Sequence, residues 1–540
     1  MLPPPDIRGV YRTDERARAA YAEAAGIYRI IPRAVCLPAD VADLERIICW
    51  AADHRLPLVP RAAGSGMAGG NVGDGVVVDL TQMADQRLEV DPNGRCAVTS
   101  AGITLAALNT AAAQHQLRLP PDPSSGAWAT LGGMVSTNAA GARSVRYGSV
   151  RPWVEALTLL TSDGQATKLR RGKVPEDHSP SLSRFGQEAA PAIRSAAAHI
   201  RSRFPRTRKN SAGYALDAFL DSGDVLDLVI GAEGTLGIVT EIEWRLDPIP
   251  RHRAGLRVAL TQLDELSNSI RILLESRPSA LELLDRTFLD LVADQRVAGA
   301  GLRFTAAEAV LLVELERDDP RTLRESIEEA TARIRPLAYA VDSAYSEEAA
   351  QRLWAIRHAA SPIIAALPDS RRSLQVIEDA CIPIDRMGEY IRRLRNAASA
   401  RGISIVMFGH AGDGHVHVNL LPDIVRSGWE ASVAALLDDV TDTVIELGGT
   451  PTGEHGDGRL RAATLRRVYG DQIVELFHQV KQSLDPPGIF NPGVILPSGE
   501  PPISRLKVGQ DAVPLPRDIE RGLREIEVTA GYARCRLELA

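Results

Sequence analysis

Three glycine-rich segments, each beside an apolar strand-like run, restrict the folds that this chain can adopt. They span residues 59–71 (VPRAAGSGMAGGN), 119–149 and 231–239 (GAEGTLGIV). Glycine tolerates positive φ, and successive backbone N–H groups in such loops form a concave surface that suits phosphate. The first segment is neither a G-K-[ST] loop nor a G-x-G-x-x-G turn into a helix, because a strand-like run follows it. One such loop is often only a turn, but three that feed one small sheet favour a long ligand with a central pyrophosphate.

Hydrophobic periodicity predicts an α+β chain. Helical spacing occurs in residues 41–52, 263–275, 323–334, 349–367, 431–447 and 517–528. Strand-like runs occur at 56–59, 76–80, 97–100, 154–161, 237–246, 255–260, 309–315, 404–409 and 415–420. With the proline-rich break at 247–250 as a boundary, we predict a helical arm (1–30), a nucleotide-binding domain (31–247), a second α+β domain (248–497) and a tail (498–540).

Composition excludes several classes of protein. Lys and Arg number 62 and Asp and Glu 69, and this net charge of −7 argues against non-specific nucleic-acid binding. The five scattered cysteines include no C-x-x-C pair, so we expect neither a disulfide framework nor an iron–sulfur cluster, and a cytoplasmic location. No stretch is long and apolar enough to predict a membrane-spanning segment, although peripheral attachment to an inner membrane remains open.

Histidines gather in two short segments of the second predicted domain. Residues 409–420 read GHAGDGHVHVNL, and residues 453–457 read GEHGD. Alternation in the first segment places His415, His417 and Asn419 on one face of a strand, and a short turn brings His410 back toward them. A single histidine is more often a structural hydrogen-bonding group, but four with a glutamate suit a zinc ion or a similar divalent metal.

The glycine-rich region, from about residue 31 to 246, resembles the FAD-binding domain of the vanillyl-alcohol oxidase/PCMH flavoprotein superfamily. Some members attach flavin through a histidine where this chain has Ser65, so the resemblance implies non-covalent FAD. It implies FAD contacts from Arg61, Gly64, Ser65, Gly66, Met67, Gly70 and Asn71 around the pyrophosphate, from Pro121, Asp122, Ser125, Thr130, Gly132, Gly133, Asn138, Gly141 and Tyr147 along the flavin, and from Glu233, Gly234, Gly237 and Val239 at the adenosine end.

The histidine segments resemble the C-terminal signature of FAD-linked D-2-hydroxy acid dehydrogenases, whose FAD-linked oxidase C-terminal domain has a ferredoxin-like α+β fold. The resemblance implies zinc or manganese ligands at His410, His417 and Glu454, and a catalytic base at His455. It further implies substrate contacts from Arg357 (in the W-x-x-R of residues 354–357), Ser361 and Asn419, and a flavin contact from Asn491.

The implied reaction is oxidation of a D-2-hydroxy acid, with the hydroxyl proton passing to a base and hydride passing to flavin N5. An ordinary histidine pKa near neutrality suits His455 for this role. Relatives specific for D-2-hydroxyglutarate carry a lysine that is missing from residues 375–383, so we predict a cytochrome-type D-lactate dehydrogenase of lactate catabolism, with Arg371 or Arg372 as possible replacements for that lysine.

Two other functions stay open. One is the FAD subunit of a complex that oxidises glycolate or D-2-hydroxyglutarate, and the other is a non-redox transferase like alkylglycerone-phosphate synthase. Because the chain lacks iron–sulfur ligands, we expect an external electron acceptor, which could be a cytochrome, a quinone, an electron-transfer flavoprotein or a separate iron–sulfur subunit. A homodimer is possible.

Overall fold

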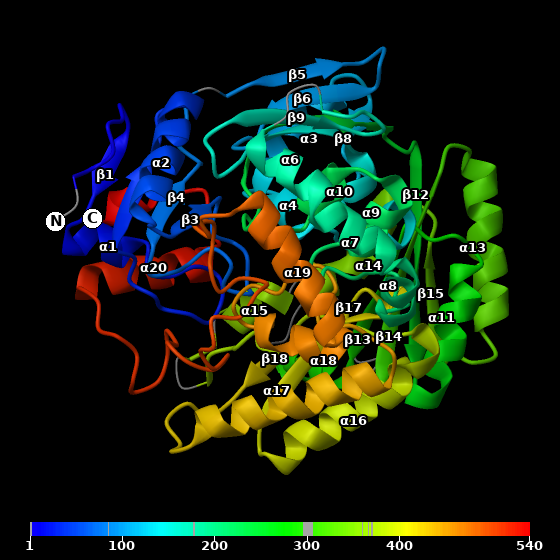
Figure 1. Cartoon of the computed structure of the whole chain (residues 1–540). Helices are drawn as coiled ribbons and strands as arrows, with labels where there is room; N and C mark the ends of the chain where they lie inside the picture. The colour runs from blue at the N-terminus through cyan, green and yellow to red at the C-terminus, as the bar shows by residue number, and fades with distance from the viewer. Residues whose placement is uncertain are drawn as a thin grey trace.

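The computed structural model describes residues 3–84, 86–175, 179–294, 306–358, 360–365, 367–368 and 371–540 (Figure 1). These residues form a four-, a five- and a seven-stranded sheet and one two-stranded pair of β11 (Asp247–Pro248) with β7 (Leu117–Arg118). The first has the order β1-β2-β4-β3. Its strands are β1 (Val10–Arg12), β2 (Ala34–Leu37), β4 (Val76–Asp79) and β3 (Leu58–Arg61). Helix α2 (Val41–His54) packs on it, begins at an Asp40 side chain that accepts from the Asp43 N–H, and ends at Arg55 with φ 51°.

The N-terminal segment differs from the predicted helical arm. Its helix α1 (Glu15–Ala20) has only six residues. Strand β1 pairs antiparallel with β2, so this segment is an edge of the first sheet. The predicted helix is therefore limited to six residues, and the strand before it forms by pairing with β2, a contact between distant segments that local sequence does not show.

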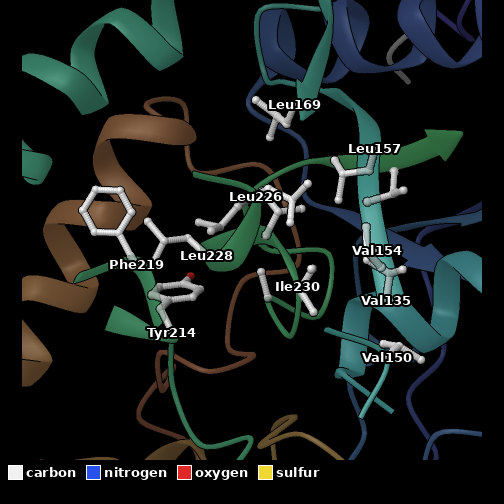
Figure 2. Packing of buried hydrophobic residues seen from close by; sticks show 14 of the residues in the cluster. Val135, Val150, Val154, Leu157, Leu169, Tyr214, Phe219, Leu226, Leu228 and Ile230 are labelled. Atoms are coloured by element: carbon white, nitrogen blue, oxygen red, sulfur yellow. The ribbon is translucent and has the colours of Figure 1, made fainter. Parts of the chain in front are cut away.

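The second sheet has the order β5-β6-β10-β8-β9 and is antiparallel. Its strands are β5 (Leu88–Asp91), β6 (Cys96–Ser100), β10 (Ile238–Arg245), β8 (Val154–Leu160) and β9 (Ala166–Arg170). Figure 2 shows one hydrophobic cluster that includes Val154 and Leu157 of β8 and Leu226 and Leu228 of α10 (Val225–Val229), with Phe219 of α9 (Leu216–Ser222) at its other side. Helix α19 (Asp471–Leu484), far along the chain, joins the same core through Phe477, whose ring meets Tyr214 edge-on at 5.7 Å.

The third sheet is antiparallel and has the order β15-β12-β14-β13-β17-β18-β16. Its strands are β15 (Ala340–Ala344), β12 (His252–Leu260), β14 (Ala309–Arg317), β13 (Ala280–Asp285), β17 (Ser404–Gly409), β18 (His415–Leu421) and β16 (Ala380–Cys381). On one face pack α11 (Leu266–Leu274), α13 (Pro320–Ile334), α16 (Met387–Ala400) and α17 (Trp429–Glu446), and on the other α12 (Arg286–Asp294) and α14 (Glu347–His358). The prediction of an α+β chain is confirmed.

The C-terminal segment returns to the beginning of the chain. Helix α20 (Arg517–Thr529) lies beside α1, close to both termini (Figure 1). Its Ile519 and Leu523 are buried in one cluster with Tyr21. No helix in the described ranges is long and apolar enough to cross a membrane.

Candidate active site

A cavity of about 730 Å³ is bordered by the three glycine-rich segments, the third sheet and the C-terminal segment. Seventeen of the 21 predicted cofactor residues line it: Arg61, Gly64, Ser65, Gly66, Met67, Gly70, Asn71, Asp122, Ser125, Thr130, Gly132, Gly133, Gly141, Glu233, Gly234, Gly237 and Val239. The predicted site residues Arg357, His410, His417, Asn419, Glu454 and His455 line the same cavity. Folding thus joins the phosphate-type loops and the histidine segments, which lie far apart in sequence, in one space.

Four predicted cofactor residues do not line the cavity, namely Pro121, Asn138, Tyr147 and Asn491. The Tyr147 hydroxyl donates to Glu316 at 2.6 Å, and Asn138 is the left-handed C-cap of helix α4 (Leu131–Thr137). Asn491 donates from Nδ2 to the backbone oxygen of Gly70 at 2.7 Å. Tyr147 therefore ties the second loop to β14, and Asn138 and Asn491 hold the local backbone in shape.

Arg61 lines the cavity, but its guanidinium donates hydrogen bonds to backbone oxygens of the protein. Nη2 donates to the backbone oxygen of Glu23 at 2.8 Å, and Nη1 donates to those of Tyr21 and Asn71 at 3.3 and 3.4 Å. The side chain is only 1% exposed. Arg61 therefore fixes the shape of the first glycine-rich loop.

Three electron-pair donors converge on one point of the cavity wall. The Nε2 atoms of His410 and His417 lie 3.2 Å apart, and Oε1 of Glu454 lies 3.2 and 3.4 Å from them. Ligands at zinc–nitrogen distances in a tetrahedral shell are about 3.3 Å apart. The spacing of these three atoms therefore fits one divalent cation.

Hydrogen bonds on the far side of each imidazole fix its orientation. Nδ1 of His417 donates to the backbone oxygen of Glu378 at 2.9 Å, and Nδ1 of His410 donates to Oε1 of Glu282 at 2.5 Å. Nε2 of both rings therefore faces Glu454. Burial lowers the pKa of His410, but Glu282 outweighs it and raises the pKa to about 9, so a divalent cation at the convergence point would have to displace the Nε2 proton of His410. Such outer partners are usual for histidines that bind metal.

Lys209 contacts both Glu454, the third donor, and a third histidine, His415. Its Nζ donates to Oε2 of Glu454 at 2.7 Å, which leaves Oε1 for the convergence point. Burial would raise the pKa of Glu454, but Lys209 and the nearby histidines hold it well below its usual range, so the carboxylate is ionised. His415 also lies in this cluster, but its Nε2 contacts Asp379 at 2.9 Å and its Nδ1 contacts Lys209 at 3.4 Å. Both nitrogens of His415 are thus engaged by groups other than His410 and His417.

His455 sits at the edge of this cluster, with its ring stacked on that of His417 at 5.2 Å. Nδ1 faces Oε1 of Glu378 at 3.2 Å, whereas Nε2 is 3.6 Å from Oε1 of Glu454. Burial lowers the pKa of His455, but Asp379 and Glu378 outweigh it and raise the pKa to about 9, above the near-neutral value expected from sequence. A divalent cation at the convergence point would oppose those carboxylates and favour the neutral ring.

Glycine is required in the turn that carries Glu454 and His455. Gly456 has φ 78°, and a Cβ there would lie 2.5 Å from Cδ of Glu233. The Glu233 carboxylate accepts the N–H of Asp457 at 2.7 Å and that of Gly458 at 3.0 Å. Burial and the neighbouring Asp457 raise the pKa of Glu233 to about 8. Glu233, predicted at the adenosine end of FAD, thus fastens this turn to the first domain.

The predicted substrate contacts face the same space. Nε of Arg357 donates to Oε2 of Glu282 at 2.9 Å, and its guanidinium carbon lies 4.4 Å from the centre of the Phe408 ring. Asn419 is buried and lines the same cavity. Ser361 falls in helix α15 (Ala360–Ala365), and its side chain lies outside the described part of the structure.

Sequence reasoning missed the acidic and basic residues that position these groups. Glu282 bridges Arg357 and His410, and His410 and Arg357 overcome its burial to hold its pKa at about 2. The only signal was an acidic residue within the apolar run 280–284. Lys209 lies in the basic run RTRK (206–209), and Glu378 and Asp379 lie in the segment 375–383, but nothing in these sequences marks the three as partners of the histidines.

Comparison with known proteins connects this geometry to flavin chemistry. Residues 32–170 match the model of an FAD binding domain, and residues 249–495 match that of the C-terminal domain of FAD linked oxidases. The chain is 30% identical over 501 residues to D-lactate dehydrogenase of Archaeoglobus fulgidus, covering 92% of this chain and 97% of that one. It is also 30% identical over 471 residues to the glycolate oxidase subunit GlcD of Bacillus subtilis, covering 86% and 89%.

The fold is found in solved structures as well. p-Cresol methylhydroxylase with bound substrate superposes with a TM-score of 0.67 at 13% identity, over 91% of this chain and 94% of that one. At this identity the likeness concerns the fold, and it agrees with the predicted two-domain architecture.

Proposed function

We propose a reaction for this chain within the family to which it belongs, the FAD-linked D-2-hydroxy acid dehydrogenases. FAD-dependent oxidation of a 2-hydroxy acid is the activity at family level. Within it, the substrate proposed is D-lactate, oxidised to the 2-oxo acid. The observation that carries this is the convergence of His410, His417 and Glu454 beside His455 and Arg357, in the cavity that the glycine-rich loops share.

The side chains divide the chemistry between them. Arg357 would pair with the substrate carboxylate, since Glu282 takes its Nε and orients the rest of the guanidinium. Nε2 of His455 would accept the hydroxyl proton, because Nδ1 is directed at Glu378. A zinc or manganese ion held by His410, His417 and Glu454 would lower the pKa of the substrate hydroxyl. FAD bound along the three loops would supply the two-electron acceptor.

The electrons would then leave through another molecule, because the five cysteines give no iron–sulfur ligand set. A cytochrome, quinone, electron-transfer flavoprotein or separate iron–sulfur subunit could serve. The likeness to a glycolate oxidase subunit favours a second candidate, in which this chain works only inside a complex. Turnover of D-lactate by the purified chain with an artificial dye acceptor would exclude that candidate.

Anaerobic mixing with D-lactate is the direct test of the proposed function. We expect full bleaching of the flavin absorbance band at about 450 nm, because flavins lose that band on two-electron reduction. L-lactate should cause no bleaching. The absorbance at that band is followed in a stopped-flow instrument. If no D-2-hydroxy acid in a panel that includes glycolate and D-2-hydroxyglutarate bleaches the flavin, the dehydrogenase proposal fails and the non-redox transferase gains support.

Flavin attachment gives a second prediction. Ser65 stands on the cavity wall at the place where a histidine would carry the covalent bond, and serine does not form that link. We expect acid precipitation to release all the yellow colour into the supernatant. Flavin fluorescence that stays with the precipitated polypeptide would contradict non-covalent binding.

A further inference from the structure

A segment outside both matched family regions forms part of the cavity wall. The second match ends at residue 495, yet Arg524 and Glu527 of α20 line the cavity together with Tyr532. Tyr532 also approaches Trp128 of the second glycine-rich segment, with ring centres 6.0 Å apart. The C-terminal segment therefore contributes side chains to the active cavity of this chain.

Glu527 is an anion in this wall. Its carboxylate pairs with Nη2 of Arg372, and it lies 3.3 Å from Nζ of Lys507 and 3.5 Å from Nη1 of Arg524. Burial would raise the pKa of Glu527, but Lys507 and Arg372 lower it to about 2. Glu527 is thus charged at any pH at which the enzyme would be assayed.

Arg372 belongs to the end of the cavity that would hold substrate. The adjacent Ser373 donates from its hydroxyl to Oδ1 of Asn419 at 3.0 Å, and both line the cavity with Arg357 and Arg372. The Arg372 side chain is only 12% exposed, and its Nε has no hydrogen-bond partner among the described residues. Arg357 and Arg372 therefore place two guanidinium groups on the wall of this cavity, and Arg524 lies on the same wall beside Glu527.

The two guanidinium groups are paired differently. Glu282 accepts from Nε of Arg357, whereas Glu527 accepts from Nη2 of Arg372. A carboxylate binds a guanidinium most strongly through two parallel N–H···O bonds, and Glu527 already takes Nη2 of Arg372. A carboxylate that approached Arg372 would have to displace Glu527 or lie beside it, and like charges in a partly buried site repel.

We propose that Glu527 makes this enzyme selective for 2-hydroxy acids with a single carboxylate, by occupying Arg372 and excluding a second substrate carboxylate. The inference rests on the proposed function. Glu527 acts here by attraction to Arg372 and by repulsion of the competing substrate, which is the usual way in which a site gains specificity.

The test compares D-lactate with D-2-hydroxyglutarate on the FAD-loaded enzyme. In Glu527→Gln, kcat/KM for D-2-hydroxyglutarate relative to D-lactate should rise by about tenfold or more, because Arg372 loses its competing anion. Glu525→Gln is the matched control, since it makes the same charge change two residues away at an exposed position of α20. In that variant the ratio should not change.

A double variant locates the effect. Adding Arg372→Gln to Glu527→Gln should return the ratio to the wild-type value, since the cation that would receive the second carboxylate is gone. If Glu527→Gln does not retain FAD, Glu527→Asp moves the carboxylate back by one methylene and should raise the ratio by about threefold.

Two results would overturn the inference while leaving the dehydrogenase proposal intact. One is a wild-type enzyme that already oxidises D-2-hydroxyglutarate better than D-lactate. The other is an unchanged ratio in both Glu527 variants, with FAD bound. Absence of flavin reduction by every 2-hydroxy acid would instead refute the proposed function itself.

Discussion

Replacing His455 with alanine is expected to slow flavin reduction by D-lactate by about three orders of magnitude, because loss of a general base commonly costs 10²–10⁴-fold. FAD should remain bound at the wild-type ratio, since His455 is held by Glu378 and Asp379 rather than by the glycine-rich loops. Stopped-flow bleaching measures the reduction rate, and the absorbance of the purified protein measures FAD content.

The control for that experiment is His478→Ala. His478 is exposed on α19, so its removal tests the general effect of losing an imidazole from the surface. It should leave the reduction rate unchanged. A His455→Ala protein that bleached as fast as the wild type would remove His455 from the mechanism, whereas loss of FAD would show that the residue is structural.

Replacing His417 with alanine is expected to remove the divalent metal and, with it, flavin reduction. Two of three converging donors would remain, and His410 and Glu454 alone would not complete a zinc site. Loss of activity should exceed the roughly 10- to 100-fold cost of removing an outer partner of a metal ligand. The measurement is metal content per chain after reconstitution with zinc or manganese, alongside FAD content and bleaching.

Chelation gives the matching test on the unaltered chain. Treatment with EDTA should abolish bleaching by D-lactate, and zinc or manganese should restore it, while FAD stays bound. His115→Ala, at an exposed position, serves as the control variant and should keep its metal. A wild-type enzyme that reduces its flavin at full rate without metal would exclude a catalytic ion at this site.

Local sequence patterns predicted much of the framework because they report on short-range physics. The apolar run at 309–315 became β14, and the helical face of 41–52 became α2 with a capping aspartate at its start. The same patterns did not predict elements whose structure depends on packing between distant segments. Strand β13 was not predicted, and it brings Glu282 to the site. Residues 1–30 were expected as a helical arm, but Val10–Arg12 within them form the edge strand of the first sheet.

Sequence by itself determined which chemical groups this protein has: glycine-rich loops of a flavin-binding type, and histidines and a glutamate at spacings that suit a metal and a base. Only the tertiary structure decided which partners those groups have and how their side chains are oriented. Strand pairing and helix packing bring Lys209, Glu282 and Glu378 against the imidazoles, and these partners fix which nitrogen faces the cavity. The tail likewise delivers Glu527 to Arg372 from 155 residues away. Electrostatic interactions depend on distance in space and on burial, so a single sequence, which gives only distance along the chain, does not contain them.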